Sequence, residues 1–382
     1  MEKNESEVLE KEEGNLILIL TSECNLRCTY CYEDHKKRKS MSLETAKQVI
    51  SEVLNREDKY RFVRILLFGG EPLLEFELIR EMCEWTWKNN WPVKYIFSFS
   101  TNGTLLNKEM KAWIQHNRDK IELVLSADGN KYSQDINRSN SFDKIDFDFF
   151  IKTNEHPMVK MTISRESLPF LYENVVFFHE KGFDFAECNM AVGIDWKNEE
   201  LYNILREQLE QLVQYYKVNK HLTPANILNM DLEMCERIRK VQKWCGVGKE
   251  LMTVDTDGKR YPCNYITPMS FSNEDLQKLL STDFTKDIEI LDGECLEKCY
   301  LFPICPTCYA ADYSLTGKIK TKNKSACKLV ELRAYYTAIL QMDRMEDIDI
   351  GNLSDEEKFL LYKRIQAIKK IIKDYIPCNS YI

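Results

Sequence analysis

The chain lacks long apolar runs and has no surplus of basic residues. No stretch approaches the ~20 consecutive apolar residues that a membrane-spanning helix needs, and residues 1–13 are acidic and polar rather than an apolar signal segment. The formal net charge is −8, whereas nucleic-acid binding needs a concentrated basic surface that neutralises phosphates. We therefore expect a soluble, cytoplasmic protein that binds neither membranes nor nucleic acid.

Cysteine, in contrast, is plentiful. The 382 residues include 14 cysteines, and because a reducing cytosol disfavours disulfides, metal binding explains them better. Ten of them fall into two groups with ligand-like spacing, one around residue 28 and one between residues 245 and 327. The other four are expected to be packing residues: Cys83, Cys188, Cys235 and Cys378. The length of the chain predicts two or three structural units.

The first group is Cys24, Cys28 and Cys31, directly after an apolar segment. A 4Fe–4S cluster normally takes four cysteine thiolates, so three leave one iron free to bind another molecule. S-adenosylmethionine is the obvious candidate, because its amino and carboxylate groups can chelate that iron and an electron from the cluster can cleave its sulfonium. On the motif alone, a structural zinc site or three unrelated buried thiols remain the alternatives.

Strand-like and helix-like segments alternate from Asn15 onward, which predicts strand–helix units and a parallel sheet. The expected strands are residues 16–20, 63–68, 93–100, 121–126, 158–163 and 185–190. Barrel enzymes keep functional residues on the loops after such strands. The loops after the first four strands hold the cysteines, Gly69-Gly70-Glu71-Pro72, Thr101-Asn102-Gly103 and Ser126-Ala127-Asp128-Gly129.

Local signals predict several other elements. Ser42 is the expected N-cap of a helix, and helical patterns run over residues 171–181 and 197–219. Asp257-Gly258 between two short strand-like segments predicts a two-residue hairpin. The chain from Leu329 onward is expected to be helical, with Ser354 opening a capping box.

The cysteine pattern with Tyr30 before its last cysteine, followed by the GGEP run after the second strand, resembles the radical SAM superfamily. This resemblance implies an α/β fold with a partial (β/α)6 barrel. It also implies that the GGEP motif contacts the methionyl amino group of S-adenosylmethionine and that a serine and an arginine contact its carboxylate. The candidate cofactor-binding residues are Tyr30, Gly69, Gly70, Glu71, Pro72, Asn102, Ser126, Arg138, Ser164 and Asn189. For each, an ordinary turn or packing role is the alternative.

The second cysteine group resembles a SPASM domain, an extension that carries two auxiliary 4Fe–4S clusters behind the barrel. The resemblance assigns Cys245, Cys263 and Cys308 to the first auxiliary cluster, and Cys295, Cys299, Cys305 and Cys327 to the second. With the cluster near the amino end, this makes three 4Fe–4S clusters. Zinc knuckles are the alternative, because they also use closely paired cysteines.

The sequence departs from the family pattern at three points. The cysteines from Cys295 to Cys308 are spaced x3, x5, x2 rather than the usual x2, x5, x3. The first auxiliary group has three cysteines, so either Cys235 or another protein ligand completes it, or one iron stays open. Sulfatase-maturating enzymes place an aspartate after the cysteine that matches Cys263, where this chain has Asn264. An amide cannot act as a carboxylate base, which weakens the sulfatase interpretation.

The resemblance implies an enzyme that oxidises a peptide or protein side chain. We expect a peptide maturase that abstracts a hydrogen from a ribosomally made precursor and forms a thioether or carbon–carbon cross-link. A formylglycine-generating sulfatase maturase, a peptide epimerase and a non-catalytic iron–sulfur electron carrier are the alternatives. The expected partners are the precursor peptide, a one-electron donor such as flavodoxin or ferredoxin, and a separate peptide-recognition protein. No pattern identifies the catalytic acid–base residue.

The expected organisation has four parts. Residues 1–14 form an N-terminal tail, and residues 15–235 form the barrel and its bridging helices. Residues 236–330 form the SPASM domain, and residues 331–382 form a C-terminal helical segment.

Overall fold

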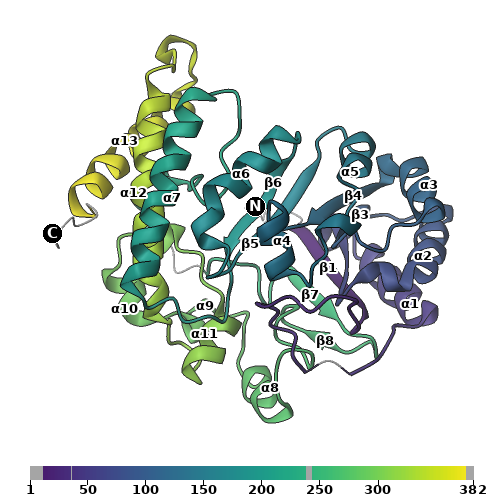
Figure 1. Ribbon diagram of the computed structural model, residues 1–382. Coiled ribbons are helices and arrows are strands. Elements are labelled where there is room, and N and C mark those ends of the chain that lie inside the picture. Colours follow the sequence, from purple (N-terminus) through teal and green to yellow (C-terminus); the bar gives the residue numbers. More distant parts are fainter. Residues whose placement is uncertain (1–11, 36, 238–242, 376–382) are drawn as a thin grey trace, which may run out of the picture.

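The computed structural model describes residues 12–35, 37–237 and 243–375, and Figure 1 shows their arrangement. These residues form one eight-stranded sheet in the order β6-β5-β4-β3-β2-β1-β7-β8, parallel up to β7, with β8 antiparallel. The strands are β1 (Glu12–Thr21), β2 (Tyr60–Gly69), β3 (Lys94–Thr101), β4 (Ile121–Ser126), β5 (Met158–Ile163), β6 (Asp184–Met190), β7 (Leu251–Val254) and β8 (Arg260–Tyr261).

Helices alternate with the first six strands and then dominate the rest of the chain. The first set is α1 (Leu43–Leu54), α2 (Phe76–Lys88), α3 (Lys108–His116), α4 (Lys131–Asn137), α5 (Phe147–Thr153) and α6 (Leu171–Glu180). The second set is α7 (Glu199–Val218), α8 (Asn273–Leu280), α9 (Asp287–Ile290), α10 (Gly293–Lys298), α11 (Tyr309–Thr316), α12 (Cys327–Met345) and α13 (Asp355–Asp374). The short 3-10 helices are η1 (Pro72–Glu75), η2 (Arg118–Lys120), η3 (Phe142–Lys144), η4 (Leu168–Phe170), η5 (Leu232–Glu236), η6 (Phe302–Ile304), η7 (Lys324–Ala326) and η8 (Ile350–Asn352).

The predicted parallel α/β fold is confirmed. All six expected strands form, and those at 121–126 and 158–163 have the predicted bounds. β1 begins earlier than its apolar run, because the polar residues from Glu12 to Asn15 pair with β2. Ser42 caps α1 as predicted, since its side chain accepts a hydrogen bond from the Thr45 N–H at 3.0 Å.

The hairpin between β7 and β8 differs from the prediction in its turn. The Asp255 N–H donates to the Lys259 carbonyl oxygen at 2.9 Å, so the loop holds three residues rather than two. Gly258 has φ of +81°, while Asp257 has no positive φ. This is the three-residue loop that ends in a left-handed glycine, so the left-handed position falls on Gly258 alone.

β7 lies after residue 235, the expected domain boundary, yet it belongs to the same sheet as the six strands before that boundary. Residues Asn15 to Leu18 of β1 pair in parallel with Leu251 to Val254. The hairpin that leads to Cys263 is therefore built onto the same strand that leads to the first cysteine group.

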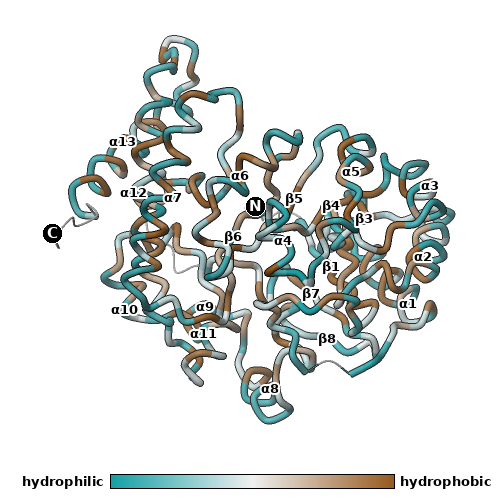
Figure 2. Tube along the Cα trace, in the orientation of Figure 1, coloured by the Kyte–Doolittle hydropathy of each residue, from teal (hydrophilic) through white to brown (hydrophobic). Residues whose placement is uncertain are grey.

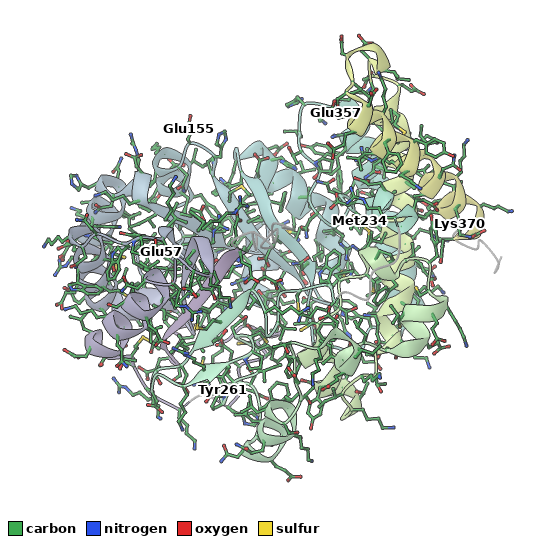
Figure 3. All side chains as sticks on the ribbon, turned by 180° about the vertical axis from the view of Figure 1, so that it is seen from behind. Glu57, Glu155, Met234, Tyr261, Glu357 and Lys370 are labelled. Atoms are coloured by element: carbon green, nitrogen blue, oxygen red, sulfur yellow. The ribbon has the colours of Figure 1, made fainter. Side chains whose placement is uncertain are left out.

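The core lies where the strand pattern requires it. Leu16 and Leu18 on one face of β1 and Ile17 and Ile19 on the other are at most 5% exposed, as expected for a parallel strand covered on both faces. Figure 2 shows apolar residues concentrated along the strands and the inward helix faces. Figure 3 shows the charged side chains of Glu155 and Lys370 at the periphery, where both residues are exposed.

The C-terminal helices form a layer at one end of the sheet (Figure 1), where α12 packs against α7 and α13. Ser354 and Glu357 form the predicted capping box at the start of α13. Arg364 of α13 makes a two-pronged ion pair with Glu233 of η5, with distances of 3.0 and 3.1 Å. Among the described residues, no helix combines the length and apolar character needed to cross a membrane.

Candidate active site

The first cysteine group lies on the loop that follows β1. The Cys31 N–H donates to the Cys28 carbonyl oxygen at 3.1 Å, and the Leu26 N–H reaches the Cys24 sulfur at 3.4 Å. Burial raises the pKa of Cys28 to about 11, and the nearby thiols of Cys24 and Cys31 act in the same direction. The loop thus gathers three thiols, of which Cys31 is exposed.

Gly69 and Gly70 let the end of β2 pass close to this loop. A Cβ at Gly69 would lie 2.2 Å from the Thr21 carbonyl oxygen, and a Cβ at Gly70 would lie 2.2 Å from that of Glu23. Gly69 also has φ of +145°, which residues with a side chain rarely adopt. The Gly70 N–H donates to Thr21 and the Glu71 N–H donates to Glu23. The glycine pair therefore holds the cysteine loop against β2.

The carboxylate of Glu71 is buried and has its partners within the protein. One oxygen accepts hydrogen bonds from the Thr101 hydroxyl at 2.7 Å and the Leu73 N–H at 3.1 Å. The other accepts from the Asn102 N–H at 2.9 Å. Burial raises the pKa of Glu71 against the effect of these hydrogen bonds. Glu71 thus joins the loops after β2 and β3, and the buried Pro72 begins η1.

The loop after β4 provides a buried carboxylate, Asp128, that receives four hydrogen bonds. Oδ2 accepts from the Tyr30 hydroxyl at 2.6 Å and the Asn137 amide at 3.0 Å. Oδ1 accepts from the Thr162 N–H and pairs with Arg138 Nη2, both at 3.0 Å. Sequence analysis did not select Asp128 for any role. The sequence signal for a role of Asp128 was its place in the motif Ser126-Ala127-Asp128-Gly129, at the carboxyl end of β4.

Arg138 lies beside this carboxylate with donor capacity to spare. Its guanidinium is 5.6 Å from the centre of the Tyr30 ring. Its Nε is buried and has no hydrogen-bond partner among the described residues. A guanidinium with a free donor suits a carboxylate ligand, and three thiols on one loop suit iron. The residues therefore fit a cluster with bound S-adenosylmethionine.

Two other candidate cofactor residues bond within the protein. The Asn102 amide donates to Asn25 of the cysteine loop at 2.9 Å. The Ser164 hydroxyl donates to Asn137 at 2.7 Å, and Ser164 is 1% exposed. Both side chains connect neighbouring loops at the carboxyl end of the sheet.

Ser126 and Asn189 stand at the ends of β4 and β6. Ser126 is half-buried. The Asn189 side-chain oxygen accepts a hydrogen bond from the Asn226 amide at 3.0 Å. Both keep part of their surface accessible.

Cys245, Cys263 and Cys308, the first auxiliary group, pack against one small hydrophobic cluster of the cysteine-rich region. Burial raises the pKa of Cys308 to about 12, and Cys263 and Cys245 add to the effect. Tyr32, the residue after Cys31, reaches this group. Its hydroxyl accepts a hydrogen bond from the Asn264 amide at 2.8 Å. Tyr32 therefore connects the two cysteine regions, a contact that sequence analysis missed.

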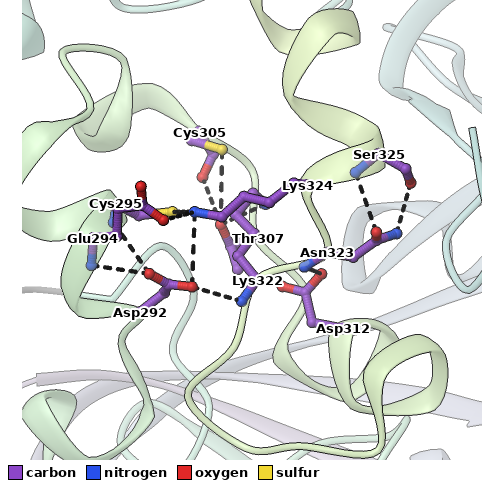
Figure 4. A network of polar contacts seen from close by, with 10 residues as sticks. All are labelled: Asp292, Glu294, Cys295, Cys305, Thr307, Asp312, Lys322, Asn323, Lys324 and Ser325. Carbon is purple, nitrogen blue, oxygen red and sulfur yellow. Dashed lines mark hydrogen bonds and ion pairs between the residues drawn. The ribbon is translucent and has the colours of Figure 1, made fainter. Parts of the chain in front are cut away.

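Cys295, Cys299, Cys305 and Cys327, the second auxiliary group, line one cavity of about 50 Å³. Burial raises the pKa of Cys327 to about 11, with Cys305 and Cys295 contributing. Figure 4 shows the polar residues around Cys295 and Cys305. Across the described residues, no three histidine, cysteine or acidic side chains are arranged to enclose a single metal ion.

Of the alternatives for completing the first auxiliary group, the structure does not favour Cys235. Cys235 packs with Leu301 and Cys305, in a different hydrophobic cluster from Cys263 and Cys308. The reason is that η5, which carries Cys235, contacts η6 and α13. Cys83 and Cys188 are buried in the sheet core, as expected for packing residues, while Cys378 lies outside the described residues.

A cavity of about 410 Å³ lies between the first cysteine loop and the cysteine-rich region. Tyr30, Cys31 and Tyr32 line one side. Tyr265 and Tyr313 line the other, and the rings of Tyr32 and Tyr265 stack with centroids 4.0 Å apart. The volume falls in the usual range for ligand sites, about 300–1,000 Å³.

A sequence profile of the radical SAM superfamily matches residues 18–146. The chain contains a radical SAM domain. The cysteine-type anaerobic sulfatase-maturating enzyme of Clostridium perfringens (strain 13 / Type A) is 25% identical over 325 residues, which are 76% of this chain and 86% of that enzyme. An uncharacterized protein of Methanocaldococcus jannaschii is 29% identical over 169 residues, 43% of this chain and 57% of that protein.

Solved structures share the fold of this radical SAM chain. The structure described as native anSMEcpe with bound AdoMet has a TM-score of 0.69 at 19% identity, covering 88% of this chain and 100% of that one. Streptococcus suis SuiB bound to precursor peptide SuiA has a TM-score of 0.53 at 17% identity, covering 78% and 72%. Residues 18–146 thus match the radical SAM superfamily, the chain is similar over most of its length to a sulfatase-maturating enzyme, and it shares the fold of the solved structures.

Proposed function

We propose that this radical SAM enzyme is a peptide maturase that abstracts a hydrogen from a ribosomally made precursor and forms a thioether or carbon–carbon cross-link. Cys24, Cys28 and Cys31 would hold the cluster. When bound, the cluster supplies the electron that cleaves the sulfonium of S-adenosylmethionine to a deoxyadenosyl radical. The chain itself binds and orients the reactants and keeps water from them.

The residues around Asp128 would orient S-adenosylmethionine. Arg138 offers its unpaired Nε donor to the carboxylate, and Ser126 adds a hydroxyl at the same edge of the sheet. Asp128 holds Arg138 and Tyr30 in place by hydrogen bonds. The backbone of the GGEP loop lies against the cysteine loop, within reach of the methionyl amino group. Tyr30 lines the cavity beside the expected adenine position.

The remaining candidates would act at the edge of this cofactor site. Asn102, Ser164 and Asn189 lie on the loops after β3, β5 and β6. Glu71 and Pro72 would act through the loop they stabilise, because both oxygens of Glu71 already have protein partners.

The observation that carries the proposal is the 410 Å³ cavity beside Cys31. Its walls come from the first cysteine loop and from the cysteine-rich region, so a side chain that enters lies next to both. The tyrosine rings can pack against an apolar side chain, while polar lining residues such as Asp34, His35 and Asp275 can hydrogen-bond a peptide backbone. Related folds solved with the Cp18Cys peptide and with precursor peptide SuiA support a peptide substrate.

Asn264 favours cross-linking over formylglycine formation. An amide oxygen is too weakly basic to take a substrate proton, and the amide nitrogen of Asn264 donates to the Tyr32 hydroxyl at 2.8 Å. Asp255, an acid in the hairpin before Cys263, accepts hydrogen bonds from the turn of the β7–β8 hairpin and from the Tyr261 hydroxyl. Sulfatase maturation remains the second candidate, because the Clostridium perfringens maturase aligns over 76% of this chain.

We further propose that residues 236–330 act as a SPASM domain with two auxiliary 4Fe–4S clusters. The first would use Cys245, Cys263 and Cys308, and the second would use the second auxiliary group. Anaerobically reconstituted protein should then contain about twelve irons per chain. A small one-electron protein such as flavodoxin or ferredoxin would supply the electron, and a separate protein would present the precursor.

The first test is anaerobic incubation with dithionite and S-adenosylmethionine. We expect release of 5'-deoxyadenosine, and we expect combined Cys24→Ala, Cys28→Ala and Cys31→Ala replacement to abolish it. Cys83→Ala is the matched control, since Cys83 is buried in the sheet core, away from the cysteine loop. No release from protein with intact clusters would instead support a non-catalytic electron carrier.

The second test identifies the product. Short peptides encoded beside the gene are coexpressed with the enzyme and weighed by mass spectrometry. A loss of two hydrogens supports a cross-link, and an unchanged mass with altered chirality supports an epimerase. Conversion of a sulfatase-derived cysteine peptide to formylglycine, with every neighbouring peptide unmodified, would overturn the proposal in favour of sulfatase maturation.

A further inference from the structure

Two lysines lie beside the second auxiliary group, Lys324 at the Cys295 sulfur and Lys322 at Thr307, which contacts Cys305 (Figure 4). The Lys324 Nζ donates to the Cys295 sulfur at 3.1 Å. The Lys322 Nζ donates to the Thr307 hydroxyl at 3.1 Å, and that hydroxyl in turn lies 3.8 Å from the Cys305 sulfur. Lys322 is only 8% exposed, so its ammonium group is held near the thiols rather than in solvent.

The position of Lys322 needs a counter-charge, because burying an ammonium group is costly unless it is paired. The groups near it that can become negative are Asp312 and the thiols of Cys305 and Cys327, which would be thiolates once they bind iron. Burial raises the pKa of Asp312, which makes its carboxylate harder to ionise. The thiolates of a bound cluster would supply the stronger negative charge.

Lys324 has carboxylates on its other side. Its Nζ is 3.8 Å from Asp292 and 3.4 Å from Glu294. Asp292 also accepts a hydrogen bond from the Cys295 N–H at 3.2 Å, which fixes this acid close to the cysteine. Removing Lys324 would therefore take away one positive charge and leave a carboxylate near the cluster without its cation.

The first auxiliary group is surrounded differently. The thiol of Cys263 meets the backbone N–H groups of Tyr265 and Ile266, and that of Cys308 meets the backbone of Ala311. Lys243 lies near Cys245, but its Nζ hydrogen-bonds the Phe284 carbonyl oxygen and pairs with Asp287. Among the described residues, the second group has a hydrogen bond from a lysine to a cysteine sulfur, between Lys324 and Cys295.

We propose that Lys322 and Lys324 are positioning residues that raise the reduction potential of a 4Fe–4S cluster held by the second auxiliary group. This inference rests on the cofactor set of the proposed function. Reduction adds one negative charge to the cluster, and nearby cations and hydrogen bonds to sulfur stabilise the reduced form. A higher potential suits a cluster that accepts the electron left on a substrate after hydrogen abstraction.

Lys324→Met tests the inference without opening the core, because the Lys324 side chain is 48% exposed. A unit charge a few Å away at an effective dielectric constant of about 20 changes an equilibrium by more than tenfold. We expect the midpoint potential of one auxiliary cluster to fall by at least 59 mV, which is about tenfold for a one-electron couple. Lys324→Arg keeps the charge and should keep the potential.

The measurement is an anaerobic titration followed by electron paramagnetic resonance. It uses the full chain carrying Cys24→Ala, Cys28→Ala and Cys31→Ala, so that only auxiliary clusters contribute. Lys320→Gln is the matched control, because Lys320 is exposed and lines the same cavity. Equal potentials for Lys324→Met and the parent, or an equal fall for Lys320→Gln, would overturn the inference.

Iron analysis separates this inference from the proposed function. Cys295→Ala with Cys305→Ala should remove about four irons per chain. If the iron content stays unchanged, no cluster occupies this group and the inference fails. Release of 5'-deoxyadenosine by the unmodified enzyme would still support radical chemistry at the first cysteine group.

Discussion

Asp128→Asn tests whether one buried carboxylate holds the cofactor site together. The side chain of Asp128 is fully buried, and that of Arg138 is 10% exposed. Asparagine keeps the shape but has one acceptor oxygen and no charge. It cannot serve Tyr30, Asn137, Arg138 and the Thr162 N–H together. The change therefore leaves the Arg138 guanidinium buried without its anion.

The expected cost is large. Removing one partner of a buried ion pair destabilises a protein by about 3–5 kcal/mol, a substantial part of the usual total of about 5–15 kcal/mol. We expect the free energy of unfolding in urea to fall by that amount. Loosening Arg138 should also weaken a charge-assisted hydrogen bond to S-adenosylmethionine, about 1.5–3 kcal/mol. Calorimetric titration should then show Kd raised by about 10- to 150-fold.

A second replacement separates stability from cofactor binding. Adding Arg138→Met to Asp128→Asn removes the unpaired charge, and replacing both members of a buried pair is often close to neutral. The double variant should regain most of the lost stability yet still bind S-adenosylmethionine weakly. Asp148→Asn, at an exposed carboxylate paired with Lys152, is the control and should change neither quantity. Normal unfolding and normal binding for Asp128→Asn would refute the reasoning.

Two further predictions concern the loop contact and a buried histidine. Gly70→Ala places a Cβ against the Glu23 carbonyl oxygen, so we expect a lower melting temperature and less iron; Gly293→Ala, where the space is open, should change neither. Burial lowers the pKa of His179, which hydrogen-bonds the Tyr216 hydroxyl. As the pH falls, the unfolded chain therefore binds a proton at this histidine more readily than the folded chain does. Stability in urea should therefore fall between pH 7.5 and pH 5.5. His179→Gln should flatten this dependence, and an unchanged slope would exclude His179 as its source.

The strands were predictable because each carries its own signal. β4 and β5 are short apolar segments between polar turns, and their bounds match the prediction. β1 is longer than predicted because pairing with β2, rather than its own composition, sets its start. β7 pairs with a strand more than 200 residues earlier in the chain, and no local pattern specifies such a neighbour.

The candidate site likewise has parts that local sequence patterns predict and parts that depend on contacts between distant residues. The cysteine groups follow from spacing within the sequence, and each group is close-set in the structure. Asp128 was missed because its role depends on Tyr30, 98 residues away. The bond between Tyr32 and Asn264 spans 232 residues. The alternative in which Cys235 completes the first auxiliary group stayed open in the sequence, because closeness along the chain to Cys245 does not specify the side on which η5 packs.

These long-range contacts explain why the cavity is already formed. β1 leads into the first cysteine loop and also pairs with β7, whose hairpin leads to Cys263. The stacked rings of Tyr32 and Tyr265 join the same two regions on the cavity side. These two connections fix the cavity walls relative to each other. Peptide binding therefore does not carry the free-energy cost of bringing the walls together. Breaking the ring contact alone should therefore weaken peptide binding more than it weakens binding of S-adenosylmethionine, which Arg138, fixed by Asp128, would bind in the proposed site.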